Sequence, residues 1–243
     1  MKAMLLAAGR GERMRPLTDD TPKPLLRAGG KPLIVWHIEN LARAGIRDLV
    51  INHAHLGQQI VNALGDGGRY GVRILYSPEN PALETAGGIA NALPLLCQSC
   101  SGGGREMAAE PFAVINSDTY CDYDFANLPI HAAAVKASGD AAHLVLVNNP
   151  IQHLEGDFNL YNGRVSDGLP KLTFSGIGIY QPALFSSLIR GRPAPLAPLL
   201  RAQMAHNRIS GELYNGCWVD VGTPQRLEQL DKALHQPHNT EHE

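Results

Sequence analysis

The sequence predicts a three-layer α/β fold with a mostly parallel central sheet and an antiparallel subregion in its second half. In the first half, short apolar runs alternate with segments of helical periodicity, which is the pattern of parallel crossover units. In the second half, an Asn-Gly pair at 162–163 stands between two short apolar pieces and indicates a β-hairpin. The length of 243 residues suits a single domain, which we expect at 1–234, followed by a flexible tail at 235–243.

The first half is expected to contain four strands and three helices. The apolar run AMLLAA predicts the first strand. The first long helix is predicted because Ile34, Ile38 and Leu41 recur at helical spacing and Gly45 follows as a helix stop. The expected strands are 3–8, 48–54, 72–78 and 111–118, and the expected helices are 31–45, 57–67 and 85–96.

The second half has a different pattern, with strands that are not separated by regular helices. The stretch DFNLYNGRV predicts the hairpin with the Asn-Gly turn, and GELYNGCWVDVGT predicts a second hairpin. The expected strands are 142–149 and 171–185, the hairpins are 157–165 and 211–223, and the helices are 196–209 and 224–234.

Composition and charge exclude several classes of protein. The formal net charge is −2 and the sequence pI is about 6.5, so no nucleic-acid partner and no anionic membrane surface is expected, and any phosphate site must be local. No window approaches the roughly 18 apolar residues that a membrane helix needs. The opening MKAMLLAAG is too short for a signal peptide because GRGERMR follows directly. We therefore expect a cytoplasmic protein.

The cysteines raise the question of a metal or redox site. Cys97 and Cys100 have the C-x-x-C spacing that zinc and thiol chemistry use. Structural zinc normally needs four ligands, and neither Cys121 nor Cys217 lies at a spacing that would form a second pair. Two incidental thiols of a cytoplasmic protein are the favoured interpretation.

The loop after the first strand is the first candidate site, because ligands of open α/β sheets collect at the carboxyl ends of the strands. Gly9 and Gly11 allow the backbone to approach a ligand closely, and Arg13 and Arg15 add fixed positive charge. Met14 stands where G-x-G-x-x-G needs its third glycine, and the P-loop pattern is absent as well. On the residues alone, a phosphate cradle and an ordinary basic loop both remain open.

Longer motifs carry a resemblance. The stretch AAGRGERMRPLT, followed by TPKPL, resembles the signature of the sugar-1-phosphate nucleotidyltransferases. This resemblance implies a Rossmann-like, GT-A-like fold with a nucleotide-binding half at about 1–128 and a sugar-binding half at about 140–234. It implies a nucleoside triphosphate and a sugar 1-phosphate as substrates. The loop residues that it assigns to the nucleotide are Ala8, Gly9, Gly11, Glu12, Arg13 and Lys23.

The implied reaction explains which other groups to seek. A phosphate monoester is largely dianionic at neutral pH, since its second pKa is about 6, so its attack on the α-phosphorus needs no general base. The obstacle is repulsion between two polyanions, which cations and alignment relieve. The resemblance implies that Lys23 contacts the transferring phosphate, that Arg13 neutralises the departing pyrophosphate and that Asp118 is the third catalytic residue.

Two carboxylates are candidates for holding Mg²⁺. Asp118 directly follows the strand pattern VINSD, where the family has a Gly-Asp pair; an ordinary helix N-cap is the alternative. Ser117 replaces the usual glycine, which predicts a slightly crowded ligand site. Asp220 lies in CWVDVGTPQRL, which resembles the family's W-x-D-x-G-T element, and a structural salt bridge is the alternative role.

The nucleotide base and the sugar have their own candidate segments. The stretch SPENPALETAGGIANAL resembles the base-reading segment, with Glu84 in place of a common glycine. The candidate base contacts are Glu79, Gly87 and Gly88, and Asn116 is a further candidate nucleotide contact. The candidate sugar contacts are Asn148, Asp157, Ser175 and Gly176. The family's E-K-P element is not recognisable, and Lys171 is at best a loose substitute.

Further stretches resemble a uridylyltransferase subgroup of bacterial cell-wall recycling, among them LTFSGIGIY and SGELYNGCWVDVGTPQRL. This implies UTP as donor, a muramic acid sugar phosphate as acceptor and a monomer or small homo-oligomer. The alternative is a guanylyl- or thymidylyltransferase acting on mannose or glucose 1-phosphate. A non-catalytic nucleotide-sugar sensor is a third possibility, although such a protein should have lost Lys23 or the two carboxylates.

Overall fold

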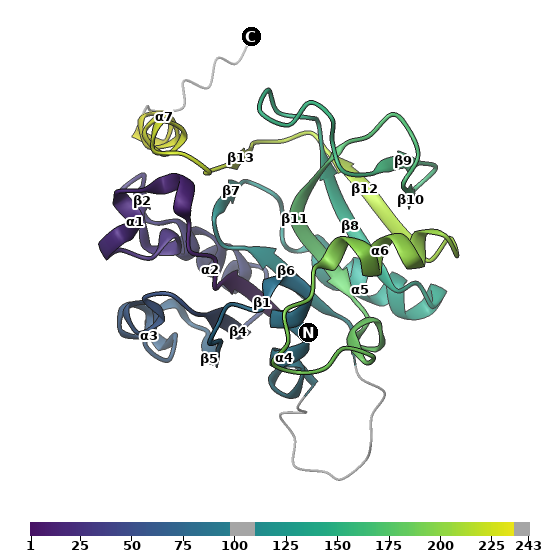
Figure 1. Cartoon of the computed structure of the whole chain (residues 1–243), viewed down its shortest axis with the longest axis horizontal. Helices are drawn as coiled ribbons and strands as arrows, with labels where there is room; N and C mark the ends of the chain where they lie inside the picture. The colour runs from purple at the N-terminus through teal and green to yellow at the C-terminus, as the bar shows by residue number, and fades with distance from the viewer. Residues whose placement is uncertain (98–109, 236–243) are drawn as a thin grey trace.

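The computed structural model describes residues 1–97 and 110–235, and a nine-stranded sheet runs through it (Figure 1). Its strand order is β5-β4-β1-β6-β11-β8-β12-β10-β9. The nine strands are β1 (Lys2–Ala7), β4 (Asp48–His53), β5 (Arg73–Pro78), β6 (Phe112–Asn116), β8 (Ala142–Val147), β9 (Asn159–Tyr161), β10 (Arg164–Ser166), β11 (Thr173–Tyr180) and β12 (Ile209–Tyr214). Two small sheets pair β2 (Arg27–Ala28) with β3 (Lys31–Pro32), and β7 (Thr119–Cys121) with β13 (Trp218–Asp220).

The sheet is mostly parallel, with an antiparallel subregion, as predicted. Strands β5, β4, β1 and β6 are parallel to one another, and β11 is antiparallel to both of its neighbours, β6 and β8. The chain goes from β1 to β4 on one side and later returns to β6 on the other side. The carboxyl ends of β1 and β6 are therefore a topological switch point, where open α/β sheets bind their ligands.

Helices cover both faces of the sheet, and the alternation of side chains along β1 shows why. Ala3, Leu5 and Ala7 pack with α2 (Leu33–Arg43), α3 (Gly57–Leu64) and α5 (Asn127–Ser138), whereas Met4 packs with α4 (Glu84–Cys97), η4 (Pro182–Phe185) and α6 (Leu196–Met204). A strand buried on both faces reads as a continuous apolar run, which is what the sequence has there. The result is three layers (Figure 1).

A third apolar cluster attaches the C-terminal helix to the N-terminal segment. Met14 and Leu33 pack with Val221, Leu227 and Leu230, so that α7 (Pro224–His235) lies against the segment that follows β1 (Figure 1). This segment also contains η1 (Glu12–Met14), α1 (Leu17–Asp20) and η2 (Lys23–Leu25), and η3 (Gly68–Tyr70) follows α3. Helix α7 and the segment after β1 thus lie together beside the switch point.

The expected strands and helices are present, together with short elements that were not predicted, namely β2, β3, β7 and α1. The first hairpin is confirmed: β9 and β10 are antiparallel, and the turn residues Asn162 and Gly163 have φ of 49° and 72°. The second predicted hairpin is wrong, because β12 pairs with β8 and β10 whereas β13 pairs with β7. Helix α5 was not predicted, although Leu128, Ala132 and Val135 on its buried face have helical spacing.

Two predictions fall partly or wholly on residues outside the described ranges: Cys100 of the C-x-x-C pair, and the tail after His235. Cys97, Cys121 and Cys217 are free thiols. Within the described residues, no helix has both the length and the apolar character that crossing a membrane requires.

Candidate active site

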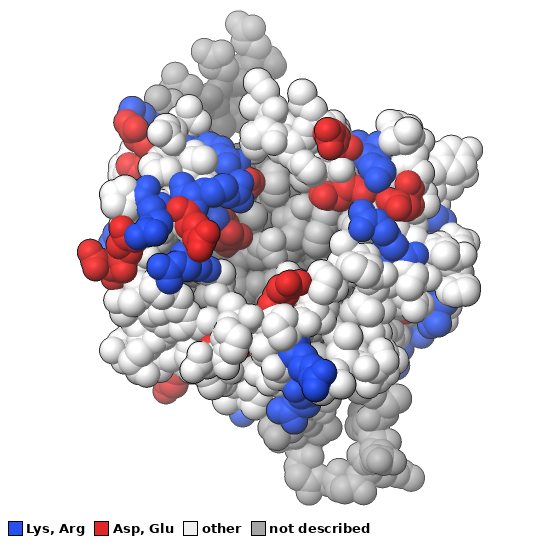
Figure 2. All heavy atoms as spheres, viewed as in Figure 1, with Lys and Arg blue, Asp and Glu red and all other residues white. Residues whose placement is uncertain are grey.

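A cavity of about 470 Å³ lies at the carboxyl ends of β1 and β6. Figure 2 shows the molecule hollowed at the centre of this face, with basic side chains, mixed with acidic ones, gathered on the side where α1 lies. Most of the residues assigned to the nucleotide from sequence line the cavity, together with others that the sequence did not indicate. The lining includes Ala8, Gly9, Gly11, Glu12, Arg13, Lys23, Asn52, Glu79, Ala82, Glu84, Thr85, Asn116, Ser117, Asp118 and Gly222.

The loop after β1 is shaped by Gly11. This residue has a φ of 68°, in the left-handed region that favours glycine, and an added Cβ would come within 3.1 Å of side-chain carbons of Lys23 and Thr18. The Thr18 hydroxyl donates a hydrogen bond to the Gly11 carbonyl (2.9 Å), and Met14 is fully buried. These contacts hold the loop against the protein while Arg13, which lines the cavity, stays exposed.

Lys23 and Asp118 meet at the floor of the cavity. The Lys23 ammonium donates to Asp118 Oδ2 at 2.6 Å, although 95 residues separate them. The Lys23 side chain is 7% exposed and that of Asp118 is 38% exposed, so the carboxylate faces the cavity more than the ammonium does. Buried Lys23 lies between Pro22 and Pro24, whose rings restrict the backbone on both sides.

Asp220 reaches the same region through the small sheet. In the register of β13 on β7, Asp220 stands opposite Thr119, the residue after Asp118. Its Oδ2 accepts a hydrogen bond from Arg226 Nη1 at 2.6 Å. The two carboxylates predicted to hold a metal are therefore brought together, and each pairs with one cation through one oxygen. The salt bridge that sequence left open as an alternative for Asp220 is present.

Buried His37 supports this arrangement and was not singled out from sequence. Its Nε2 lies 2.7 Å from the Thr119 carbonyl, which can only accept, so this nitrogen carries the proton. Burial lowers the pKa of His37, and the ring is therefore neutral at physiological pH. The contact fixes the start of β7, between the two carboxylates.

The residues present fit a hard divalent cation. Asp220 ends β13 and Asp118 directly precedes β7, its partner strand, so both offer carboxylate oxygens at one end of this small sheet. Mg²⁺ prefers one or two carboxylates, with phosphate and water completing its shell. Ser117, expected to crowd the ligand, turns its hydroxyl to the Leu6 carbonyl instead. It thereby joins the ends of β6 and β1.

The predicted base-reading segment also borders the cavity, and the buried side chain of Glu79 holds this segment in place. Glu79 is 6% exposed; its Oε1 accepts from the Asn52 amide (2.7 Å) and its Oε2 from the Leu83 backbone N–H (2.8 Å). The Asn52 Oδ1 in turn accepts from the Ala7 backbone N–H (2.9 Å). Asn52, missed from sequence, thus connects β1 to the base-side segment through Glu79.

The two glycines of this segment make close contacts within the protein. The backbone N–H of Gly87 is already bonded to the Ala194 carbonyl, and Gly88 is packed so closely that an added Cβ would lie 2.5 Å from Glu79 Oε1. Neither is among the cavity-lining residues. Glu84 and Thr85 line the cavity instead, and Glu84 has a φ of 58°, as the glycine common at this position would allow.

The predicted sugar contacts differ in their exposure to solvent. Asn148 is exposed at the end of β8 and donates to Asn215 Oδ1 (3.3 Å). By contrast, Ser175 is 1% exposed, donates to the Val145 carbonyl (2.7 Å) and accepts from the Ile177 N–H (3.1 Å). Because these bonds use its hydroxyl, Ser175 shapes β11 in this structure.

Asp157 and Gly176 also set the backbone conformation of the region that is predicted to bind the sugar. Asp157 Oδ2 accepts from the Phe174 N–H (2.8 Å), and Gly176 lies in an irregularity of β11 with a φ of 81°. An added Cβ on Gly176 would lie 2.6 Å from Asn116, which lines the cavity. Lys171 pairs with Asp167 on the surface (3.0 Å).

Known proteins resemble this chain along most of its length. The sequence profile of the nucleotidyl transferase family matches residues 2–152. An N-acetylmuramate alpha-1-phosphate uridylyltransferase of Neisseria meningitidis serogroup B is 53% identical over 236 residues, which are 94% of this chain and 96% of that protein. A mannose-1-phosphate guanyltransferase of Schizosaccharomyces pombe is 33% identical over 93% of this chain, which spans 62% of that longer protein.

Solved structures show the same fold. A structure described as a Bacillus anthracis glucose-1-phosphate thymidylyltransferase in complex with sucrose superposes with a TM-score of 0.79, at 21% identity, and covers 98% of this chain and 96% of that one. A UDP-glucose pyrophosphorylase complexed with UDP-glucose gives 0.71, at 20% identity, over 96% and 97%. The family profile covers more than half of the chain, and the Neisseria relative is matched over nearly its whole length: the chain is an enzyme of the nucleotidyl transferase family.

Proposed function

We propose that this enzyme transfers a uridylyl group from UTP to N-acetylmuramic acid 1-phosphate, giving UDP-N-acetylmuramic acid and pyrophosphate. The reaction would serve peptidoglycan recycling in the cytoplasm, with the enzyme acting as a monomer or small homo-oligomer. The observation that carries the proposal is the 53% identity to a relative of that name, matched along 96% of its length. The charges of the cavity are those that phosphate-to-phosphate transfer requires.

In this mechanism the chain's residues bind, align and neutralise. Arg13 and the backbone of the loop at Gly9 and Gly11 bind the β- and γ-phosphates that leave as pyrophosphate. Lys23, held between two prolines, stabilises charge on the α-phosphate as the acceptor oxygen approaches. Both roles use charges that are in position before the reaction, so little reorganisation is needed.

Asp118 and Asp220 would hold Mg²⁺, which supplies positive charge that shields the two polyanions from each other. Arg226 neutralises Asp220, and Lys23 neutralises Asp118, which lets two acids lie close together. Glu84 and Thr85 would face the base, and Asn148 is the candidate sugar contact whose side chain is exposed at the end of its strand.

The test is a pyrophosphate-release assay with Mg²⁺ over a grid of nucleoside triphosphates and sugar phosphates, with N-acetylmuramic acid 1-phosphate among them. Release confined to UTP and the muramic acid sugar is expected. Turnover with GTP and mannose 1-phosphate would be consistent with the proposed mechanism but would contradict the proposed substrates. Guanylyl transfer to mannose 1-phosphate is the second candidate function, because guanyltransferases are among the relatives. Tight nucleotide binding with no release in any combination would favour a sensor.

A further inference from the structure

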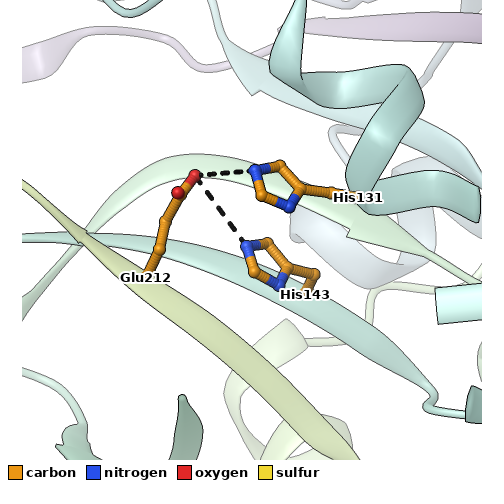
Figure 3. A group of neighbouring side chains, drawn as sticks. All are labelled: His131, His143 and Glu212. Carbon is orange, nitrogen blue, oxygen red and sulfur yellow. Dashed lines mark ion pairs between the residues drawn. The ribbon is translucent and has the colours of Figure 1, made fainter. Parts of the chain in front are cut away.

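A second group of polar side chains lies in the second half of the sheet. His131 of α5, His143 of β8 and Glu212 of β12 point toward one another (Figure 3). His143 is the second residue of β8, which runs parallel to β6, whereas the active-site cavity lies at the carboxyl ends of β1 and β6. The group, here called the His-His-Glu cluster, has no residue in common with the cavity lining.

The three side chains are close enough to share an ion. Their potential ligand atoms all lie within 4.8 Å of one another. Glu212 Oε1 is 3.0 Å from His131 Nε2 and 3.9 Å from His143 Nε2, and the two imidazole rings are stacked with centroids 4.1 Å apart. The stacking places both Nε2 atoms on the same side, facing the carboxylate (Figure 3).

The two Nε2 atoms are also buried without a hydrogen-bond partner. This holds even for His131, because its short distance to Glu212 lacks hydrogen-bond geometry. His143 is only 8% exposed, and its other nitrogen, Nδ1, is 3.1 Å from the Ser210 hydroxyl. A buried polar atom without a partner is costly, and a metal ion is one partner that would satisfy both nitrogens together.

We propose that His131, His143 and Glu212 bind one divalent transition-metal ion, of which Zn²⁺ is the representative. Imidazole nitrogens select such ions over Mg²⁺, which prefers oxygen ligands. Two histidines and one glutamate are a known zinc ligand set and leave a fourth position for water. Tetrahedral coordination at about 2.0–2.2 Å would draw the ligand atoms to roughly 3.5 Å apart, a small adjustment for side-chain torsions.

The surroundings of the cluster support the ligands. The Tyr123 hydroxyl donates to Glu212 Oε1 (2.5 Å), and Ser210 holds the far nitrogen of His143, which are the outer contacts that orient metal ligands. The side chain of Glu212 is 32% exposed, which offers the ion a route from solvent.

The bound ion would join three elements that are distant in sequence. It would connect α5, which packs on the sheet through Leu128, Ala132 and Val135, to β8 and β12. Such an ion stabilises the folded protein because the unfolded chain lacks the assembled site. This inference does not rest on the proposed substrates.

The first experiment is calorimetric titration of Zn²⁺ into the chelator-treated full-length protein, with excess Mg²⁺ to occupy the active-site carboxylates. One ion per chain is expected to bind. His143→Asn and Glu212→Gln should each weaken this binding by at least about 100-fold, since even outer contacts of metal ligands are worth 10–100-fold. The matched control is His235→Asn, because His235 faces Asp231 at 3.5 Å and, among the described residues, belongs to no group of three potential metal ligands. The affinity of this variant for Zn²⁺ should equal the wild type's.

Two further measurements separate metal binding from misfolding. With Zn²⁺ at about 100 times its dissociation constant, the melting temperatures of the wild type and of His235→Asn should rise by roughly 5–10 °C. The melting temperatures of His143→Asn and Glu212→Gln should stay nearly the same with and without Zn²⁺. Anomalous scattering from a Zn²⁺-soaked crystal should give a peak between the three side chains. Absence of binding, binding that survives both substitutions, or a peak only at Asp118 and Asp220 would overturn the proposal.

Discussion

The N-terminal and C-terminal sides of the molecule use the polar residues of their motifs in opposite ways. On the N-terminal side, Arg13 is exposed and Asp118 faces the cavity, with Lys23 beneath it. On the C-terminal side, the hydroxyl of Ser175 and Oδ2 of Asp157 are bonded to the protein's own backbone. A polar residue in a motif can therefore act on a ligand directly or act by shaping the surface that meets it. The following predictions test this contrast.

The largest effect is expected at Lys23. Lys23→Ala should lower kcat by about 10²–10³-fold, because it removes a preorganised charge from the transferring phosphate. Lys31→Ala is the matched control: Lys31 pairs with Glu39 at the same 2.6 Å distance but lies outside the cavity lining, so its kcat should stay within a few-fold of the wild type's. Steady-state kinetics of pyrophosphate release measures kcat for both variants. Equal losses of kcat in Lys23→Ala and Lys31→Ala would contradict a direct role of Lys23 at the ligand.

The next effect concerns Gly176. Gly176→Ala should destabilise the protein by about 2–4 kcal/mol, because a left-handed φ and a Cβ 2.6 Å from Asn116 add together. Gly163→Ala separates the two causes: its φ is 72° but its Cβ would meet nothing within 4 Å, so about 1 kcal/mol is expected. Denaturant unfolding gives both values, and the same cost for both would show that the contact with Asn116 is unimportant.

A smaller effect distinguishes shape from contact at Ser175. Ser175→Ala should cost about 1–3 kcal/mol of stability, since it leaves the Val145 carbonyl and the Ile177 N–H without the hydroxyl. The KM for the sugar phosphate should change far less than the stability does. A large rise in KM with unchanged stability would return Ser175 to the direct sugar contacts that the resemblance implies.

The smallest effect lies at Asp140, away from the cavity. A two-pronged hydrogen bond from Arg164 (2.8 Å to each oxygen) holds the pKa of Asp140 below its ordinary value. A carboxyl with a lowered folded-state pKa stabilises the protein above its unfolded pKa of about 4, and this contribution is lost as the pH falls through the folded value. Asp140→Asn should therefore cost about 1 kcal/mol at neutral pH, allowing for the partly exposed Arg164.

The measurement is urea unfolding of the wild type and Asp140→Asn from neutral pH down to acid conditions. The difference in unfolding free energy should shrink toward zero as the pH falls below about 4. Pyrophosphate release at neutral pH should be the same for both proteins, because Asp140 is remote from the cavity lining. A difference that stays constant with pH would show that the charge of Asp140 contributes nothing to stability.

Local patterns predicted the elements of the first half well, because strands buried on both faces read as continuous apolar runs and helices bury one face at helical spacing. β1 and α2 are examples, and the turn at Asn162 and Gly163 has the φ values that its residues favour. The second hairpin failed for a physical reason. GELYNGCWVDVGT has two apolar pieces around a turn, but β12 pairs in parallel with β8, and β13 pairs with β7. Pairing partners are chosen by the whole sheet.

The residues of the candidate site also differ in whether local sequence alone could indicate them. Lys23, Asp118 and Asp220 could be found from sequence because phosphate chemistry requires charges in motifs. Asn52 and His37 could not, because each acts through a bond to a residue distant in sequence: Glu79 in one case and the Thr119 carbonyl in the other. Gly87 and Gly88 were assigned to the base, whereas their neighbours in space, Ala194 and Glu79, explain them.

By itself, the sequence determined the α/β class, the alternation of strands and helices, and the loop with its arginine, glycines and proline-flanked lysine, because these follow from local periodicity and backbone preference. Only the tertiary structure decided that β7 and β13 bring Asp118 and Asp220 together, that Ser175 bonds inward, and that His131, His143 and Glu212 meet. Such contacts join residues far apart along the chain, and the packing of the whole sheet and its helices sets which of them can touch.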